Sequence, residues 1–227
     1  MSDVLHITDF LDPVNRHYLS HDEGYTDGQI GSIISVYEET IPSLDDADIV
    51  LVGCGEQRGD GSGVYSLAAD VIRSQFYSLF YWHKEVKIAD IGNIKCGASL
   101  ADTYAALRTV VTELVGIGKK VIILGGSHDL TLAQYDAYKW LNRIIETTVV
   151  DAVIDLYMDS PLQSKNFLME ILTGEPNFIR HYNHIAFQSY FVNPGMLETM
   201  DKLRFDCYRL GMVKEHLEEM EPVLRNT

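Results

Sequence analysis

Three side chains in the sequence have types and spacings that could hold a metal ion. His128 follows the run Gly125-Gly-Ser, and Asp151 and Asp155 stand four residues apart. One imidazole and two carboxylates suit Mn²⁺, Fe²⁺ or Zn²⁺ better than Ca²⁺. The simpler interpretation is structural, because a histidine after a glycine turn often only packs, and acids at strand ends often cap the next helix. Spacing alone leaves both interpretations open.

Each candidate follows a short apolar run that is typical of a buried strand. The run 121–124 ends at the glycines before His128, and the run 147–150 ends at Asp151. Glycines let the chain turn sharply after a strand. Because ligands of open α/β sheets bind at the carboxyl ends of the strands, we expect the candidates at one edge of a parallel sheet.

Strands and helices are expected to alternate from residue 47 onward. This order predicts βαβ units and an α/β fold: three α/β/α layers with a mostly parallel sheet. Ser99 is the expected N-cap of the second helix. The expected strands are 47–52, 86–92, 121–124, 147–150, 185–190 and 207–210, and the expected helices are 64–81, 100–115, 130–141, 167–172, 194–203 and 213–224.

One domain over residues 1–227 is expected, because the sequence has no fixed-period repeat and no low-complexity linker. Residues 1–45 are polar and read as an irregular N-terminal extension.

In the first expected helix, periodicity places five apolar side chains on one face. They are Leu67, Val71, Ile72, Phe76 and Leu79.

The charge balance and the cysteines narrow the classes of partner and compartment. With 18 basic and 33 acidic residues, the net charge is −15, which argues against nucleic acid as a partner. No apolar run approaches the roughly 18 residues of a membrane span, so no membrane partner is expected. Three distant cysteines form neither a disulfide framework nor a zinc pattern, which indicates a cytoplasmic protein.

Two further features are weaker candidates. His181 and His184 stand near the start of an expected strand, where exposed loop histidines are the simpler interpretation. The glycine-rich loop 53–63 has neither the GxGxxG nor the GxxxxGK[ST] spacing of phosphate-binding loops.

Several motifs, taken in order, resemble the arginase, agmatinase and formimidoylglutamase family. Gly125-Gly-Ser-His-Asp-Leu-Thr131 resembles its first metal motif, GGDHS, and Asp151-Ala-Val-Ile-Asp155 stands where the family has DAHxD. The segments 69–73, 89–92 and 172–176 resemble the family's IR segment, DxGD strand and LHGxP loop. The resemblance runs from about residue 47 to about residue 210.

The resemblance implies a metal-dependent hydrolase of C–N bonds in a small guanidino or amidino (formimino) compound. In that family two Mn²⁺ ions supply a nucleophile at neutral pH by lowering the pKa of bound water. Carried over by motif, His128, Asp151 and Asp155 correspond to ligands of the first ion. Asp151 would also bridge to the second ion.

Three departures from the family pattern qualify this expectation. Val153 replaces the histidine of DAHxD, Thr173 replaces the histidine of LHGxP, and the third motif, SxDxDxxDP, has no counterpart. We therefore expect an N-terminal portion of a family member that binds no bridged metal pair. Two functions stay open: a hydrolase in the full-length protein, or a non-catalytic member that serves binding or assembly. An amide hydrolase of the histone-deacetylase type is a third.

The resemblance also implies that two strands of the family's sheet lie between the strands 121–124 and 147–150. In a chain without them we expect these two strands to pair directly, giving a six-stranded sheet. The alternative is a homo-oligomer in which a second copy covers the free edges.

Overall fold

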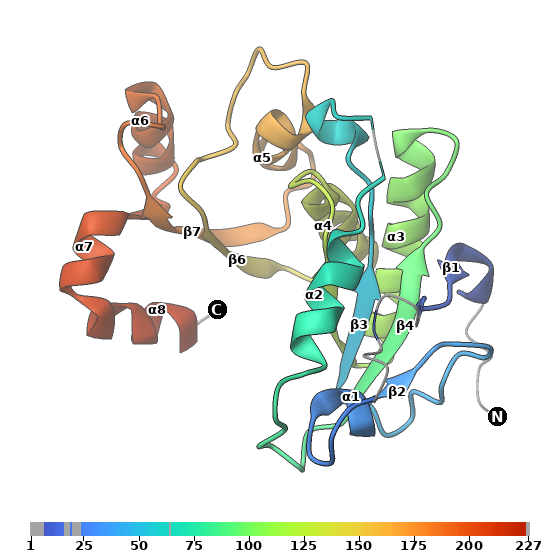
Figure 1. The fold of residues 1–227 in the computed structure, drawn as a ribbon. Helices are drawn as coiled ribbons and strands as arrows, with labels where there is room; N and C mark the ends of the chain where they lie inside the picture. Colours follow the sequence, from blue (N-terminus) through green and yellow to red (C-terminus); the bar gives the residue numbers. More distant parts are fainter. Residues whose placement is uncertain (1–6, 16–18, 20–23, 64, 226–227) are drawn as a thin grey trace. The chain divides into compact units, whose positions relative to one another are not determined.

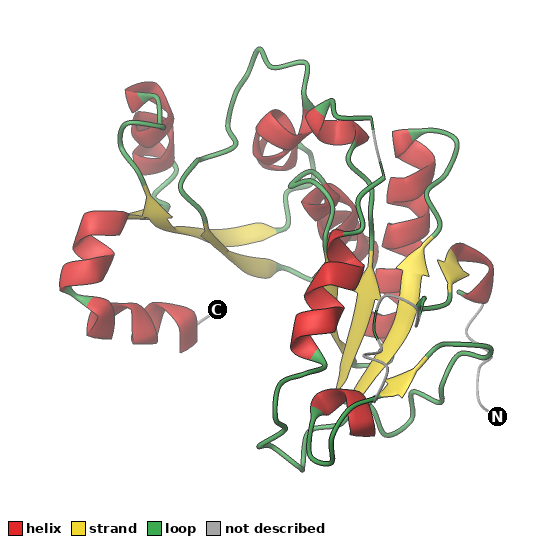
Figure 2. Cartoon of the chain, viewed as in Figure 1, coloured by secondary structure: helices red, strands yellow, loops and turns green. Residues whose placement is uncertain are grey.

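The structure, a computed structural model, describes residues 7–15, 19, 24–63 and 65–225. The chain forms two compact units, Met1–Leu141 and Asn142–Thr227. Helices and strands alternate along both units, as Figure 2 shows, and nearly all strand pairs are parallel. The predicted α/β class with mostly parallel sheets is therefore confirmed.

The first unit is built on one sheet of short, largely buried strands (Figure 1). Along the sheet the order is β1, β4, β3, β5, and β2 also pairs with β4. All these pairs are parallel except β1 with β4. The strands are β1 (Leu11–Asp12), β2 (Ser35–Val36), β3 (Ile49–Gly53), β4 (Ile88–Ile94) and β5 (Lys120–Leu124).

Helices cover both faces of this sheet, which gives the unit three layers. On one face, Val50 and Val52 of β3 belong to an apolar core with α3 and α4. On the other face, Leu51 belongs to a smaller core with α1 and α2. The helices are α1 (Ile30–Ile33), α2 (Ala68–Phe76), α3 (Leu100–Gly116) and α4 (Leu130–Trp140), with 3-10 turns η1 (Thr8–Phe10) and η3 (Arg58–Asp60).

Ser99 is the N-cap of α3, as predicted. Its side chain accepts the Asp102 N–H, and the Asp102 carboxylate in turn accepts the Ser99 N–H. This reciprocal pair forms a capping box that satisfies two otherwise unpaired donors.

The apolar face that periodicity predicts for α2 is not buried against the sheet. Of its five apolar side chains, Leu67, Val71, Ile72 and Leu79 are exposed. The buried residues of α2 are Ala69, Asp70 and Arg73. The Arg73 guanidinium donates to the carboxylates of Asp90 and Asp70 and to the side-chain oxygen of Asn93. A buried ion-pair network therefore faces the sheet where periodicity predicted an apolar stripe. The predicted first residue of this helix, Val64, lies outside the described residues.

The N-terminal segment is less irregular than expected. Leu11 in β1 is buried and pairs with β4, and Val14 donates its N–H to the carbonyl of Tyr37. Apolar residues in the described part of 1–45 thus belong to the two cores of the first unit.

The second unit contains a parallel sheet in the order β6, β7, β8. The strand β7 begins at Ile179, earlier than expected, and the expected last helix is divided at His216, where φ is −134°. The elements are β6 (Ile145–Val150), α5 (Gln163–Thr173), β7 (Ile179–Phe187), α6 (Pro194–Lys202), β8 (Asp206–Arg209), α7 (Leu210–Glu215), η4 (Leu217–Glu219) and α8 (Met220–Arg225).

The predicted direct pairing of the strands before His128 and Asp151 is wrong. Within the described residues, β5 belongs to the first sheet and β6 to the second. Six residues of β6 pair with β7 instead. The crossover rule fixes the hand of a strand–helix–strand connection but does not require the two strands to be neighbours.

Among the described helices, none is both long and apolar enough to span a lipid bilayer.

Candidate functional site

His128 lies on the exposed turn between β5 and α4. Gly125 and Gly126 have φ values of +83° and +81°, a left-handed conformation that glycine adopts without steric cost. A Cβ atom on Gly126 would lie 2.7 Å from the carbonyl oxygen of Cys54. The two glycines are therefore needed for the turn that presents His128.

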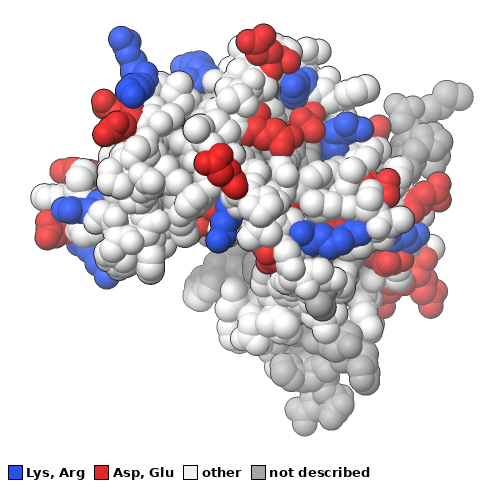
Figure 3. Space-filling view, turned by 90° about the horizontal axis from the view of Figure 1, so that it is seen from above, with Lys and Arg blue, Asp and Glu red and all other residues white. Residues whose placement is uncertain are grey.

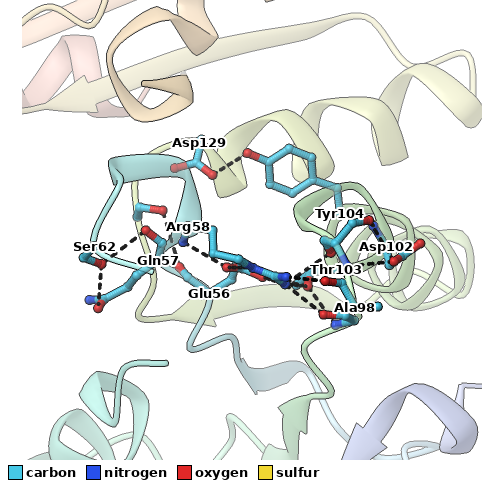
Figure 4. A network of polar contacts seen from close by, with 12 residues as sticks. Glu56, Gln57, Arg58, Ser62, Ala98, Asp102, Thr103, Tyr104 and Asp129 are labelled. Carbon is cyan, nitrogen blue, oxygen red and sulfur yellow. Dashed lines mark hydrogen bonds and ion pairs between the residues drawn. The ribbon is translucent and has the colours of Figure 1, made fainter. Parts of the chain in front are cut away.

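A buried glutamate holds the residue before His128. The main-chain carbonyl of Glu56 accepts the N–H of Ser127 at 3.0 Å. Its side chain, 2% exposed, accepts hydrogen bonds from Arg58 and from the Thr103 hydroxyl (Figure 4). Bonding to the Arg58 guanidinium lowers the pKa of Glu56 to about 2.

Arg58 connects this glutamate to the loop before α3. Its guanidinium donates to the main-chain carbonyls of Gly97 and Ala98, at 2.9 and 2.8 Å. The glycine-rich loop 53–63 thus connects the carboxyl end of β3 to the start of α3 through hydrogen bonds.

Asp129, directly after His128, is fully buried. One of its carboxylate oxygens accepts the Tyr104 hydroxyl from α3, as Figure 4 shows. Its Oδ1 atom has no hydrogen-bond partner within the described part of the chain. A Cβ atom on Gly59 would lie 2.1 Å from the carboxylate, so Gly59 leaves the space that Asp129 fills.

In the second unit, Asp151 and Asp155 follow β6 and are brought together. A carboxylate oxygen of one lies within 4.8 Å of a carboxylate oxygen of the other, and both side chains are half-buried. The Oδ1 atom of Asp151 accepts the N–H groups of Ala152 and Val153 at 2.5 and 3.3 Å. Two oxygens bound to one ion at about 2.1 Å stand up to roughly 4 Å apart, so a small rotation of either carboxylate fits one ion between them.

The positions where the family has two further histidines offer no ligand. Val153 has an isopropyl group, which cannot bind a metal ion. The Thr173 hydroxyl donates to the carbonyl of Met169 within α5, at 2.8 Å. The two aspartates therefore fit one ion, and Val153 and Thr173 supply no ligand for a second ion. His128 belongs to the first unit and the two aspartates to the second.

The interpretation of His181 and His184 as exposed loop residues is wrong, because both lie within β7. His184 is 1% exposed, and burial lowers the pKa of its imidazole. Its Nε2 atom lies 3.0 Å from the carbonyl oxygen of Asp151. His181 pairs with Asp206 of β8 at 3.0 Å. Strand alternation from Ile179 could have predicted one buried histidine, but the strand was expected to begin later.

Charges of both signs are interspersed on the face shown in Figure 3. Lysines and arginines stand beside aspartates and glutamates there, and the described residues on that face form no broad basic area. The expectation that nucleic acid is not a partner remains a prediction.

Three features together are typical of one class of protein. They are the α/β fold, the two carboxylates after β6 and the glycine turn before His128. A family model described as the arginase family matches residues 47–216, so the chain belongs to that family.

Two curated proteins similar to the chain are formimidoylglutamases. The chain is 26% identical over 111 residues to a formimidoylglutamase of Staphylococcus haemolyticus, covering 48% of this chain and 36% of that protein. It is 25% identical over 134 residues to a formimidoylglutamase of Hahella chejuensis, covering 54% and 40%. The chain thus spans less than half the length of either relative, 36% of the first and 40% of the second.

Solved structures show the same fold. Formimidoylglutamase from Bacillus subtilis superposes with a TM-score of 0.70 at 13% identity, covering 92% of this chain and 68% of that one. A Trypanosoma cruzi formiminoglutamase that carries Mn²⁺ superposes with a TM-score of 0.68 at 17% identity, covering 84% and 68%.

Proposed function

We propose that the chain is part of a Mn²⁺-dependent hydrolase that cleaves a C–N bond in a linear amidine of the formimidoylglutamate type. The observation that carries the proposal is the pair of carboxylates, Asp151 and Asp155, within 4.8 Å at the carboxyl end of β6. Family membership over residues 47–216 and the formimidoylglutamase relatives support the substrate class.

In this proposal His128, Asp151 and Asp155 bind one Mn²⁺ ion. When bound, the ion supplies Lewis-acid activation of water near neutral pH. The two carboxylates balance the charge of the ion, and the N–H groups of Ala152 and Val153 hold the Oδ1 atom of Asp151.

The test is hydrolysis by the full-length gene product. Formamide release from formimidoylglutamate is measured with and without Mn²⁺, in the wild type and in His128→Ala. We expect Mn²⁺-dependent turnover that His128→Ala reduces at least about 100-fold, because a ligand is lost. Turnover that is equal in the variant, or independent of Mn²⁺, would contradict the proposal.

A second function is favoured by Val153 and Thr173, which replace two histidines of the family motifs. It is a non-catalytic family member that keeps the fold for binding or assembly. The same assay separates the two functions, because such a member releases no formamide with any added divalent metal.

A further inference from the structure

The peptide unit between Asp151 and Ala152 is held differently from its neighbours. The N–H of Asp151, in the preceding unit, donates to the carbonyl of Ile185, and the carbonyl of Ala152, in the following unit, accepts the N–H of Gln188. These are main-chain hydrogen bonds to β7 and the segment after it. The carbonyl of Asp151 instead lies 3.0 Å from a side-chain atom, Nε2 of His184.

The hydrogen bonds of His184 fix its tautomer. A carbonyl oxygen can only accept, so Nε2 must carry the proton that it donates to Asp151. In the neutral ring Nδ1 is then the acceptor, and the Tyr182 hydroxyl, 2.9 Å away, donates to it. Both rings are buried, at 1% and 2% exposure. The result is a directed series of donors from Tyr182 through His184 to the main chain of Asp151.

This series of hydrogen bonds affects the Asp151 carboxylate through the planar peptide unit between Asp151 and Ala152. A peptide unit is planar and trans, so its C=O and its N–H point in opposite directions. When His184 holds the carbonyl of Asp151, the N–H of Ala152 must point the other way. There it donates to the Oδ1 atom of Asp151 at 2.5 Å.

We propose that His184 is a positioning residue: by binding the carbonyl of Asp151 it orients the Ala152 N–H, which fixes the Asp151 carboxylate for metal binding. This inference rests on the proposed function in taking Asp151 as a metal ligand. Tyr182 orients the imidazole of His184. His184 in turn is an outer partner of Asp151, and such partners commonly orient metal ligands. All three residues lie in the second unit.

Three variants test the proposal in the full chain. His184→Leu removes both ring nitrogens, His184→Gln keeps an amide donor within reach of the Asp151 carbonyl, and Tyr182→Phe removes only the hydroxyl. The first readout is amide hydrogen exchange without metal. We expect His184→Leu to accelerate exchange of the Ala152 N–H at least 10-fold and His184→Gln to leave it near the wild type. The matched control is the N–H of Cys207, on β8.

The second readout is the Kd for Mn²⁺, measured by electron paramagnetic resonance. We expect His184→Leu to raise it 10- to 100-fold and His184→Gln to restore most of the affinity. The third is the ¹⁵N spectrum of His184, which should show a protonated Nε2 and an unprotonated Nδ1. A merely space-filling side chain would fail both the rescue and the tautomer tests.

The outcomes separate this inference from the proposed function. If the wild type binds no Mn²⁺, the proposed function fails, and exchange at Ala152 still decides the positioning role. Unchanged exchange in His184→Leu, or His184→Gln as fast as His184→Leu, overturns the inference. If His184→Leu does not fold, Tyr182→Phe decides: exchange at Ala152 at the wild-type rate counts against the inference.

Discussion

At the scale of single residues, the predicted positions of His128 after β5 and of Asp151 and Asp155 after β6 agree with the structure, because the apolar runs before them are local signals. Their role as metal ligands stays a prediction. Glu56 and His184 were not predictable, because their roles depend on hydrogen bonds to main-chain atoms of Ser127 and Asp151, far along the chain. A sequence shows which side chains could bind a ligand, but not which ones hold the binding side chains in place.

Glu56 gives a prediction about pH. Its pKa in the folded protein is about 2, below the ordinary value of 4.5, because Arg58 bonds to the carboxylate. A depressed pKa contributes stability above pH 4.5, and that contribution is lost as the pH falls from about 4.5 to about 2. Glu56→Gln should cost about 2 kcal/mol at pH 7 and progressively less below pH 4.5. Denaturant unfolding of both proteins between pH 7 and pH 2.5 measures the difference, and a difference independent of pH would refute this account.

At the scale of elements, α2 shows how a sequence pattern can mislead. Its apolar periodicity predicted an inner face that includes Val71, yet Arg73 is buried and Val71 is 62% exposed. The period of the apolar residues does not show which helix face packs against the sheet when a buried ion pair replaces an apolar contact. The partners of Arg73 are Asp90 and Asn93 on β4, which only the folded chain brings near.

Substitutions on the two faces of α2 test this orientation. Val71→Ser should change the free energy of unfolding by less than about 0.5 kcal/mol, because the side chain is exposed. Arg73→Ala should cost about 3–5 kcal/mol, because it leaves Asp90 buried without its cation. Urea unfolding measures both. The opposite ranking would restore the orientation that the periodicity predicted.

The carboxyl end of β7 carries a strained residue. Ala186 has φ +73° where the register of β7 and β8 shifts between Ile185 and Phe187. A left-handed conformation costs an alanine about 1–2 kcal/mol, and glycine avoids most of this cost. Ala186→Gly should therefore raise the free energy of unfolding by up to about 1 kcal/mol. The control Ala105→Gly, on the exposed side of α3, should lower it by about 1 kcal/mol. Equal losses in both variants would argue against strain at Ala186.

At the scale of the whole chain, element order and fold class followed from the alternation of strands and helices, and family membership confirms them. The placement of β5 and β6 in two different sheets did not follow, because handedness rules restrict a crossover without fixing which strands become neighbours. The one-domain organisation of residues 1–227, with 1–45 as an extension, stays a prediction beside the two compact units.

The proposed function requires that the chain bind a single metal ion through His128, Asp151 and Asp155. Native mass spectrometry of the 227-residue chain titrated with Mn²⁺ tests it directly, with Asp151→Asn as the paired variant. We predict one Mn²⁺ per wild-type chain, and none in Asp151→Asn at the same concentration, because the variant lacks one charged ligand. Two ions per chain, or one ion bound equally well by the variant, would contradict it.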